Sequence, residues 1–208
     1  MAIQSNLKNM TLSLGLICLV CSALLGGAYA ITKDPIAAAA KAKTEASLSQ
    51  VLPAFDAVEE GSVEIDGTLV RYYKGLSGGA PVGYAVEAGT IGFGGPLTLM
   101  VGVTPDGVVY NTSVLSHSET PGLGAKCATD VKFMKQWEGF NPSEKILSVK
   151  KDGGDVDAIT ASTITSRAYT RAVSLALEAV KAISAPDADA VSGATVPETE
   201  NEGGQGNE

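Results

Sequence analysis

The chain has 208 residues, of which 18% are charged, and a formal net charge of −8 at pH 7. This acidic balance argues against nucleic-acid binding, which needs basic patches that attract phosphate backbones. The length suits one domain with a real hydrophobic core plus terminal segments.

An uncharged apolar segment lies near the N-terminus, between Lys8 and Lys33. As a helix, it would span about 36 Å, which is enough to cross a bilayer. We therefore predict a transmembrane helix over residues 10–31, after a cytoplasmic N-terminus of residues 1–9. A cleaved signal peptide is the alternative, because residues 28–30 read Ala-Tyr-Ala and fit the small-x-small cleavage pattern. Both interpretations export the rest of the chain.

Residues 32–50 are rich in alanine and lysine and are suited to a juxtamembrane stalk. Cys18 and Cys21 lie one helical turn apart in the apolar segment, where burial of small apolar side chains explains them more simply than a redox or metal pair. Cys127 is the only cysteine after this segment, so no disulfide is expected within the folded domain. That domain is predicted over residues 51–184.

Strand patterns dominate the first half of the domain. Apolar runs with β-branched residues predict four strands, at residues 63–73, 83–90, 97–104 and 108–115. A Pro-Asp-Gly turn separates the last two, as in a hairpin. The glycines of residues 89–95 are not followed by the Lys-Ser/Thr pair of a phosphate-binding loop. Residues 130–140 predict a short helix whose aromatic side chains pack on the sheet.

A loop rich in turn residues follows the predicted strands, where residues 117–126 read HSETPGLGAK. Alone, its proline and glycines would indicate an ordinary turn. Because glycine has no Cβ, backbone N–H groups at Gly122 and Gly124 can approach a flat ring or its carbonyl oxygens, while Leu123 can lie on an apolar ring face.

The polar residues of this loop leave several roles open. His117 is the only histidine of the chain, and it either hydrogen-bonds such a ring or is structural. Glu119 and Lys126 either pair with each other or stay solvated. We assign no proton transfer to His117.

Residues 157–166 read DAITASTITS and place an acid six positions before Thr163, in a turn of small residues. Apolar residues then recur at spacings of three and four over residues 164–183, which predicts an amphipathic helix that Pro186 ends. A Ser162 or Thr163 hydroxyl at a helix start commonly caps a backbone N–H group. The same N–H groups and the helix dipole also favour a phosphate esterified to Thr163.

The Asp-x-x-Thr-Ala-Ser-Thr sequence that begins at Asp157 resembles the Asp-x-x-Ser/Thr-Gly-Ala-Thr motif of FMN-binding domains, in which a flavin transferase attaches FMN to the last threonine through a phosphoester. The resemblance makes Asp157 the acid of the motif, Thr160 its first hydroxyl and Thr163 the flavin carrier. Ala161 stands where the family usually has glycine, and Ser162 where it usually has alanine. Both replacements are small, so the tight turn is retained.

The loop of residues 117–126 is similar to the His-x-Glu-Thr-Pro-Gly-Leu-Gly stretch of the G subunit of Rnf complexes and of its relative, the C subunit of the sodium-pumping quinone reductase. The two motifs stand in the expected order, and the similarity covers about residues 83–180. Together they imply covalent FMN on Thr163 and a set of further cofactor-binding residues: Asp157, Thr160, Ala161, Ser162, Thr165, His117, Glu119, Thr120, Pro121, Gly122, Leu123 and Gly124.

The resemblance implies a membrane-anchored electron-transfer subunit with covalent FMN, in an Rnf-type complex that couples ferredoxin:NAD electron transfer to ion translocation. Its partners would be the other membrane and peripheral subunits and, for maturation, a flavin transferase, and no independent catalysis is expected. The expected fold is α+β: an N-terminal transmembrane helix, then one FMN-binding domain with a mainly antiparallel sheet and packed helices.

The resemblance also implies that the domain lies on the periplasmic side of the inner membrane, held by a single retained anchor. A count of lysines on the two flanks of the apolar segment argues for the opposite orientation. The short N-terminal flank is nevertheless typical of export signals, and the flavin transferase of this family acts outside the cytoplasm.

Two other functions stay open: the C subunit of a sodium-translocating NADH:quinone reductase, and an exported non-redox binding or scaffold domain in which Thr163 only caps a helix. A second motif copy, DAVSGAT, ends at Thr195 in an acidic tail of disordered character, residues 185–208. It matches the consensus better, but nothing after Thr195 would bury the ring. Thr163 is therefore the predicted attachment site.

Overall fold

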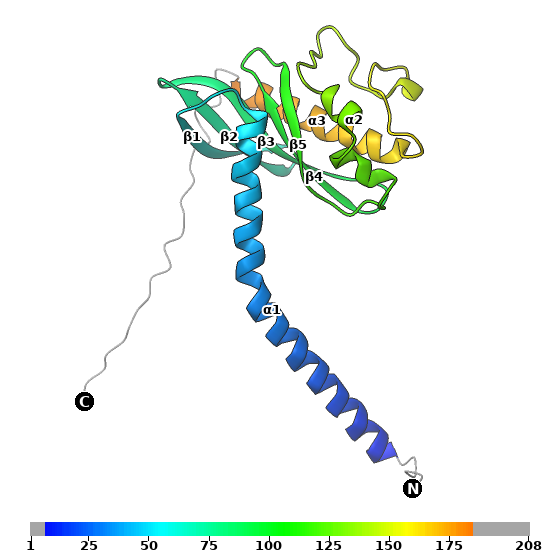
Figure 1. Ribbon diagram of the computed structural model, residues 1–208. Coiled ribbons are helices and arrows are strands. Elements are labelled where there is room, and N and C mark those ends of the chain that lie inside the picture. Colours follow the sequence, from blue (N-terminus) through cyan, green and yellow to red (C-terminus); the bar gives the residue numbers. More distant parts are fainter. Residues whose placement is uncertain (1–6, 185–208) are drawn as a thin grey trace, which may run out of the picture. The chain divides into compact units, whose positions relative to one another are not determined.

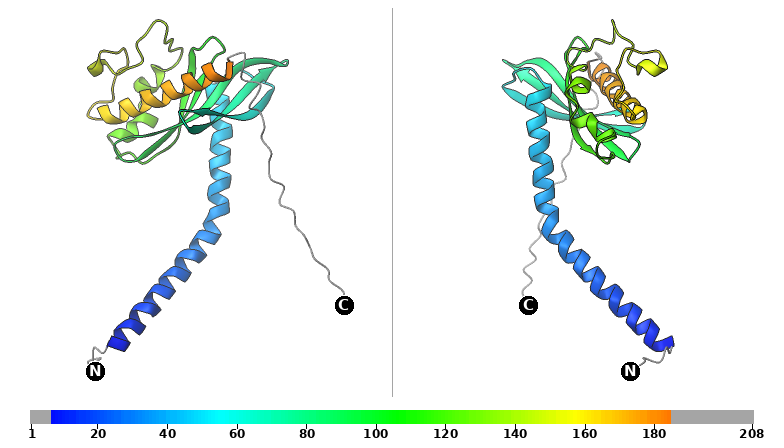
Figure 2. Two further views of the ribbon diagram at one scale, coloured as in Figure 1. Left: turned by 180° about the vertical axis from the view of Figure 1, so that it is seen from behind. Right: turned by 45° about the vertical axis from the view of Figure 1, so that its right-hand side comes forward.

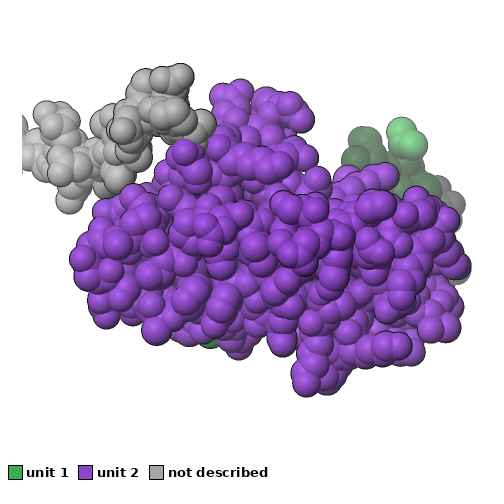
Figure 3. Space-filling view, turned by 90° about the horizontal axis from the view of Figure 1, so that it is seen from above, with its two compact units in different colours: residues 1–46 green, residues 47–208 purple. Residues whose placement is uncertain are grey.

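The computed structural model describes residues 7–184 and divides into two compact units, residues 1–46 and residues 47–208 (Figure 3). The described part of the first unit belongs to one long helix, α1 (Leu7–Val51), whose last turn lies in the second unit. This helix covers both the predicted membrane segment and the predicted stalk. It is long and apolar enough to cross a membrane.

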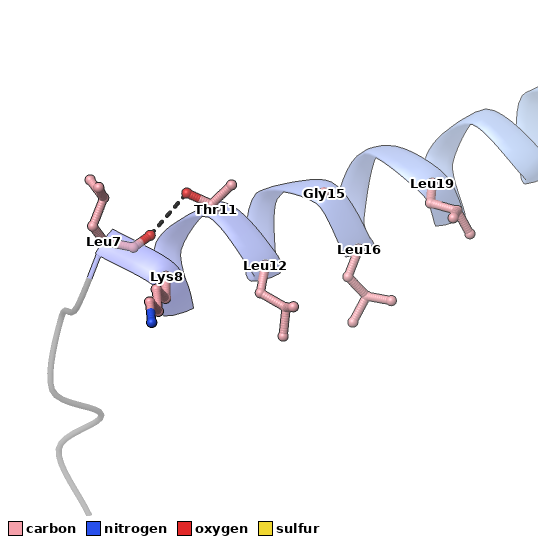
Figure 4. A pocket seen from close by; sticks show the side chains of 7 residues that line it. All are labelled: Leu7, Lys8, Thr11, Leu12, Gly15, Leu16 and Leu19. Atoms are coloured by element: carbon pink, nitrogen blue, oxygen red, sulfur yellow. Dashed lines mark hydrogen bonds between the residues drawn. The ribbon is translucent and has the colours of Figure 1, made fainter.

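The N-terminal part of α1 exposes an apolar surface. Leu12, Leu16 and Leu19 project from the helix with no other element over them (Figure 4). Thr11 turns its hydroxyl back on the helix and donates to Leu7 O at 2.9 Å, so its polar group is satisfied within the helix. The hollow along this surface is bounded by one helix only, as expected of a face that lipid covers.

The second unit is built on a five-stranded antiparallel sheet in the order β1-β2-β3-β4-β5 (Figure 1). Each strand pairs with its neighbour in the chain. The strands are β1 (Ala57–Ile65), β2 (Thr68–Ser77), β3 (Ala80–Ile91), β4 (Pro96–Val103) and β5 (Val109–His117). Together with the helices that follow it in the chain, this sheet confirms the predicted α+β class.

The single strand predicted over residues 63–73 is wrong. A turn at Asp66 and Gly67, with φ of 49° and 75°, divides it into the end of β1 and the start of β2, where Ile65 pairs with Thr68. Left-handed backbone at both turn positions suits a two-residue hairpin. The start of β1 escaped prediction because this edge strand is mostly exposed and carries little apolar alternation.

Among the described residues, four helical elements follow β5: η1 (Gly124–Ala128), α2 (Val131–Lys135), η2 (Lys150–Asp152) and α3 (Thr163–Ser184). α2 is shorter than predicted and is capped by the preceding Asp130, whose carboxylate accepts the N–H groups of Lys132 and Phe133. α3 matches the predicted amphipathic helix and lies against one face of the sheet (Figure 2).

An aromatic cluster fills the core between α3 and the sheet. Tyr169 of α3 stacks on Trp137, with ring centroids 5.1 Å apart, and Phe133 and Phe140 pack around them. The Tyr169 hydroxyl shares a hydrogen bond of 2.7 Å with Thr112 of β5. This packing confirms the structural interpretation of the aromatic residues and holds α3 in place over the strands.

The end of α1 and Leu52, the residue after it, pack on part of the other face of the sheet. Val51 and Leu52 pack there against Met100 of β4, while Leu99 and Val101 of the same strand face α3. β4 is therefore buried on both faces, which explains its continuous apolar run.

Candidate functional site

The turn before α3 places Thr163 as the first residue of the helix. Ser162 donates its N–H to Ile159 O at 3.0 Å and accepts the N–H of Ser166 at 3.0 Å. The buried Ser166 hydroxyl donates to Ser162 O at 3.0 Å and accepts the N–H of Ile159 at 2.9 Å. These bonds tie the turn to the first turn of the helix, so the half-buried Thr163 sits on a well-held backbone.

Ala161 has a left-handed backbone, with φ of 61°. A Cβ makes this conformation cost about 1–2 kcal/mol, which glycine avoids. This backbone conformation favours glycine, the residue usual at this position of the motif. Alanine, with only a Cβ, is the smallest side chain that can replace it.

We expect Ala161→Gly to raise the free energy of unfolding by about 0.5–1 kcal/mol, since the relief of strain exceeds the added backbone entropy of the unfolded chain. Denaturant unfolding of the two proteins measures the difference. Ala158→Gly is the matched control, because Ala158 has no positive φ and the same change should destabilise there. Equal effects at both positions would contradict the strain argument.

The Thr163 hydroxyl contacts a lysine. Nζ of Lys151, a residue of η2, donates to Thr163 Oγ1 at 3.1 Å. Among residues 7–184, Lys151 is the hydrogen-bond partner of the Thr163 side chain. The hydroxyl therefore faces a positive charge at the positive end of a helix dipole.

The loop that carries Lys151 is held by two ion pairs. Arg167 of α3 donates to both carboxylate oxygens of Asp152, each at 2.7 Å, and Lys150 pairs with Asp157 at 2.8 Å. The hydrogen bond from Arg167, with its charge, lowers the pKa of Asp152. The hydrogen bond from Lys150 likewise lowers the pKa of Asp157. Both carboxylates therefore stay ionised at neutral pH.

Asp157, the predicted acid of the motif, binds the loop that carries Lys151. Its carboxylate forms an ion pair with Lys150. The side chain of Gln136 hydrogen-bonds the Asp157 backbone: it accepts the Asp157 N–H at 2.8 Å and donates to the Asp157 carbonyl at 3.1 Å. Thr160 is exposed beside it. These residues precede Thr163 by six and three positions, and their roles toward a cofactor remain predictions.

Glu119 links three segments that are distant in sequence. Its Oε1 accepts the N–H of Phe93 at 2.8 Å, and its Oε2 accepts the N–H of Gly94 at 3.3 Å and the hydroxyl of Thr165 at 3.0 Å. The side chain is buried, with 6% of its surface exposed. Neither alternative from the sequence, a pair with Lys126 or a solvated carboxylate, is correct.

Two glycines make room for this carboxylate. A Cβ at Gly92 would collide with Glu119 Oε1, and a Cβ at Gly124 would collide with Glu119 Oε2 and lie 2.8 Å from Thr165 Oγ1. In this structure Gly124 therefore serves the close approach of a protein carboxylate. The proposed approach of Gly122 to a flavin ring stays a prediction.

The rest of the loop places its residues at the surface. His117 is exposed, and its Nδ1 accepts the N–H of Glu119 at 3.3 Å. Thr120 O accepts the N–H groups of Leu123 and Ala125, each at 3.2 Å, which closes the turn that contains Pro121 and Gly122. The structure thus joins this loop to the first turn of α3 through Glu119.

Three exposed apolar residues lie at or next to the backbone positions that contact Glu119. Phe93, Leu123 and Ile164 have 70%, 46% and 50% of their surface exposed. Each is the contact of Glu119 itself or the chain neighbour of a residue that Glu119 touches. Ile164 was expected on the buried face of α3, so its exposure marks the start of the helix as unusual. Exposed apolar side chains of this kind can contact a flat apolar ring.

Sequence reasoning missed three of the residues that build this site: Lys151, Ser166 and Phe93. The contacts of Lys151 and Phe93 join positions 12 and 26 apart in the chain, and no local period reports them. Ser166, three residues after Thr163, could have been predicted to hydrogen-bond the backbone of the turn, because a serine hydroxyl commonly bonds to backbone groups a few residues away.

Cys127 is a buried free thiol beside this site. Burial and then the charge of Glu119 raise its pKa to about 11. We expect iodoacetamide to alkylate Cys127 at least about a hundredfold more slowly in the native chain than in denaturant at pH 8, because the thiolate is the reacting form. Peptide mass mapping of Cys127 measures this. Alkylation at the denatured rate would contradict the assigned environment.

Two hollows occur in the described chain. One follows the apolar face of α1, and the other, of about 230 Å³, lies beside Arg167 and Arg171. Thr163 lines neither. Within residues 7–184, no cluster of three or more His, Cys, Asp or Glu side chains could hold a metal ion.

Comparison with known proteins supports the family resemblance. The FMN-binding domain family matches residues 92–178, and the RnfG N-terminal region matches residues 1–51. The G subunit of a proton-translocating ferredoxin:NAD(+) oxidoreductase complex from Clostridium ljungdahlii is 33% identical over 180 residues, which is 85% of this chain and 93% of that protein. The chain belongs to the G-subunit family of Rnf-type ion-translocating oxidoreductase complexes.

The chain is also similar to a further G subunit and, more distantly, to a solved structure. The G subunit of an ion-translocating oxidoreductase complex from Methanosarcina acetivorans is 35% identical over 78% of this chain and 88% of that protein. A crystal structure of Shewanella oneidensis NqrC superposes with a TM-score of 0.44, at 23% identity, over 58% of this chain and 64% of that one. The match to the FMN-binding domain contains both sequence motifs, which confirms the resemblance that they indicated.

Proposed function

We propose that this chain is a membrane-anchored electron carrier that holds FMN as a phosphoester on Thr163, in an Rnf-type complex coupling ferredoxin:NAD electron transfer to ion translocation. The observation that carries the proposal is the position of the Thr163 hydroxyl. It stands at the N-terminus of α3, against a cationic side chain, inside the segment that matches the FMN-binding domain.

The residues present fit this cofactor. The N–H groups at the start of α3 favour a phosphate, as does the positive end of the helix dipole. The exposed side chains of Phe93, Leu123 and Ile164 offer apolar contact to an isoalloxazine ring. When bound, FMN supplies reversible transfer of one or two electrons. The residues of this chain would hold the phosphate at Thr163 and offer apolar side chains to the ring.

Attachment requires an activated flavin donor. With a flavin dinucleotide as donor, the Thr163 Oγ1–P bond forms while the P–O–P anhydride bond breaks, a nucleoside monophosphate leaves, and the hydroxyl proton passes to a flavin transferase. No oxidant or reductant takes part. The ester then prevents loss of the cofactor from a compartment that cannot replace it.

The relatives support the assignment of the complex. Several carry the name of the G subunit of ion-translocating or ferredoxin:NAD(+) oxidoreductase complexes, including one from Acetobacterium woodii that is 34% identical to this chain. We therefore favour this assembly over the C subunit of a quinone reductase and over a non-redox scaffold. The partners would be the other subunits of the complex.

We assign residues 10–31 to the membrane, residues 32–50 to a helical stalk and residues 51–184 to the FMN-binding domain, placed on the extracytoplasmic side. The apolar length of α1 and the match to the RnfG N-terminal region support a retained anchor. The acidic tail, residues 185–208 with Thr195, lies outside the described residues.

A denaturing gel tests the proposal. The full chain, coexpressed with a flavin transferase, should give a band that fluoresces under ultraviolet light after complete denaturation, and the same chain expressed without the transferase should not. A wild-type band without flavin fluorescence in the presence of active transferase would refute covalent attachment.

A further inference from the structure

The charges beside Thr163 are unevenly balanced. Of the three consecutive charged residues of η2, Lys150 and Asp152 each have an ion-pair partner, Asp157 and Arg167. Lys151 forms no ion pair within 4 Å among the residues that the structure describes, and its ammonium group instead contacts Thr163 Oγ1. One positive charge is therefore left over at the position where the phosphoester would form.

The backbone of η2 is fixed by its surroundings. Val149 and Val156, which flank the loop, are buried with 0% and 1% of their surface exposed, and Lys150 N–H donates to Val156 O at 2.9 Å. Gly153 ends η2 in the left-handed conformation, with φ of 82°. A long lysine side chain loses conformational entropy when it is ordered, so a charged partner is needed to offset that cost.

We infer that Lys151 is the positioning residue for the flavin phosphodiester: its ammonium group pairs with the anionic phosphate esterified to Thr163. The Asp152–Arg167 pair supports it by anchoring η2 to α3 one helical turn after Thr163. The inference rests on the proposed function. It adds a residue twelve positions before the attachment site, outside both sequence motifs.

The physical basis is simple electrostatics. A phosphodiester carries one negative charge at neutral pH, and a lysine ammonium that touches the hydroxyl oxygen before esterification lies within ion-pair distance of a group attached there. The Thr163 hydroxyl of the unloaded chain is neutral. Lys151 should therefore stabilise the loaded chain more than the unloaded one.

The test is a cycle of two changes, loading with FMN and Lys151→Met, on the full chain in detergent, with scanning calorimetry as the readout. In the wild type, loading should shift the Tm of the domain upward by about 2–4 °C relative to the shift in Lys151→Met, as expected for one partly exposed ion pair. The difference should shrink in 1 M salt, because salt screens such pairs. Lys151→Arg should restore it.

Lys150→Met is the matched control, since its side chain lies on the same short helix but pairs with Asp157. Equal Tm shifts on loading in wild type and Lys151→Met would overturn the inference, as would failure of Lys151→Arg to restore the wild-type shift. Lys151→Met could also fail to take up flavin. In that case, normal loading of Lys150→Met and Lys151→Arg supports the inference. Failure of all three variants to load overturns it. A wild type without flavin refutes the proposed function instead.

Discussion

Replacing Thr163 by alanine should abolish covalent flavin, while the same change at Thr195 should leave it at the wild-type level. Thr163 combines a hydroxyl, a helix N-terminus and the ammonium group of Lys151. The variant should remain folded, because the change removes one partly exposed hydrogen bond worth about 0.5–1.5 kcal/mol. Intact mass and peptide mapping after coexpression with the transferase measure the occupancy of each threonine.

Thr163→Ser provides the conservative control. Serine keeps the oxygen that the ester needs, so any flavin that it carries shows that the transferase still reads the site. Full labelling of Thr163→Ala, with the mass on the Thr195 peptide, would move the attachment site to the tail and refute our assignment.

Replacing Glu119 by alanine should strongly destabilise the domain. The carboxylate is buried and accepts hydrogen bonds from Phe93 N–H, Gly94 N–H and the Thr165 hydroxyl. Alanine leaves these donors unpaired and opens a cavity, which should cost about 3 kcal/mol. Scanning calorimetry should show a decrease in Tm of about 6–12 °C.

Two variants frame that result. Glu119→Gln keeps the volume and one acceptor oxygen, so its loss should be smaller, about 1–2 kcal/mol. Glu138→Ala removes an exposed acid of the same kind and should change the free energy of unfolding by less than about 0.5 kcal/mol. A Glu119→Ala protein as stable as the Glu138→Ala protein would contradict the role of Glu119 as the link between the loop and α3.

Part of the site could be predicted and part could not. The motif pointed to Thr163 because its spacing is local, and the structure places that residue at the start of α3 as expected. The role of Glu119 toward the cofactor stays a prediction, and its burial was not foreseen, because two of its partners lie 26 and 46 residues away. Lys151 was missed for the same reason.

The sequence alone determined the succession of elements: an apolar helix, a hairpin of β4 and β5, a glycine loop and an amphipathic final helix. These features depend on periodicity and turn chemistry between near neighbours, which can be read along the chain. Where short-range signals were weak, as at the exposed edge strand β1, prediction was wrong. Only the tertiary structure decided that Glu119 is buried and that Lys151 faces Thr163, because packing sets contacts between distant segments.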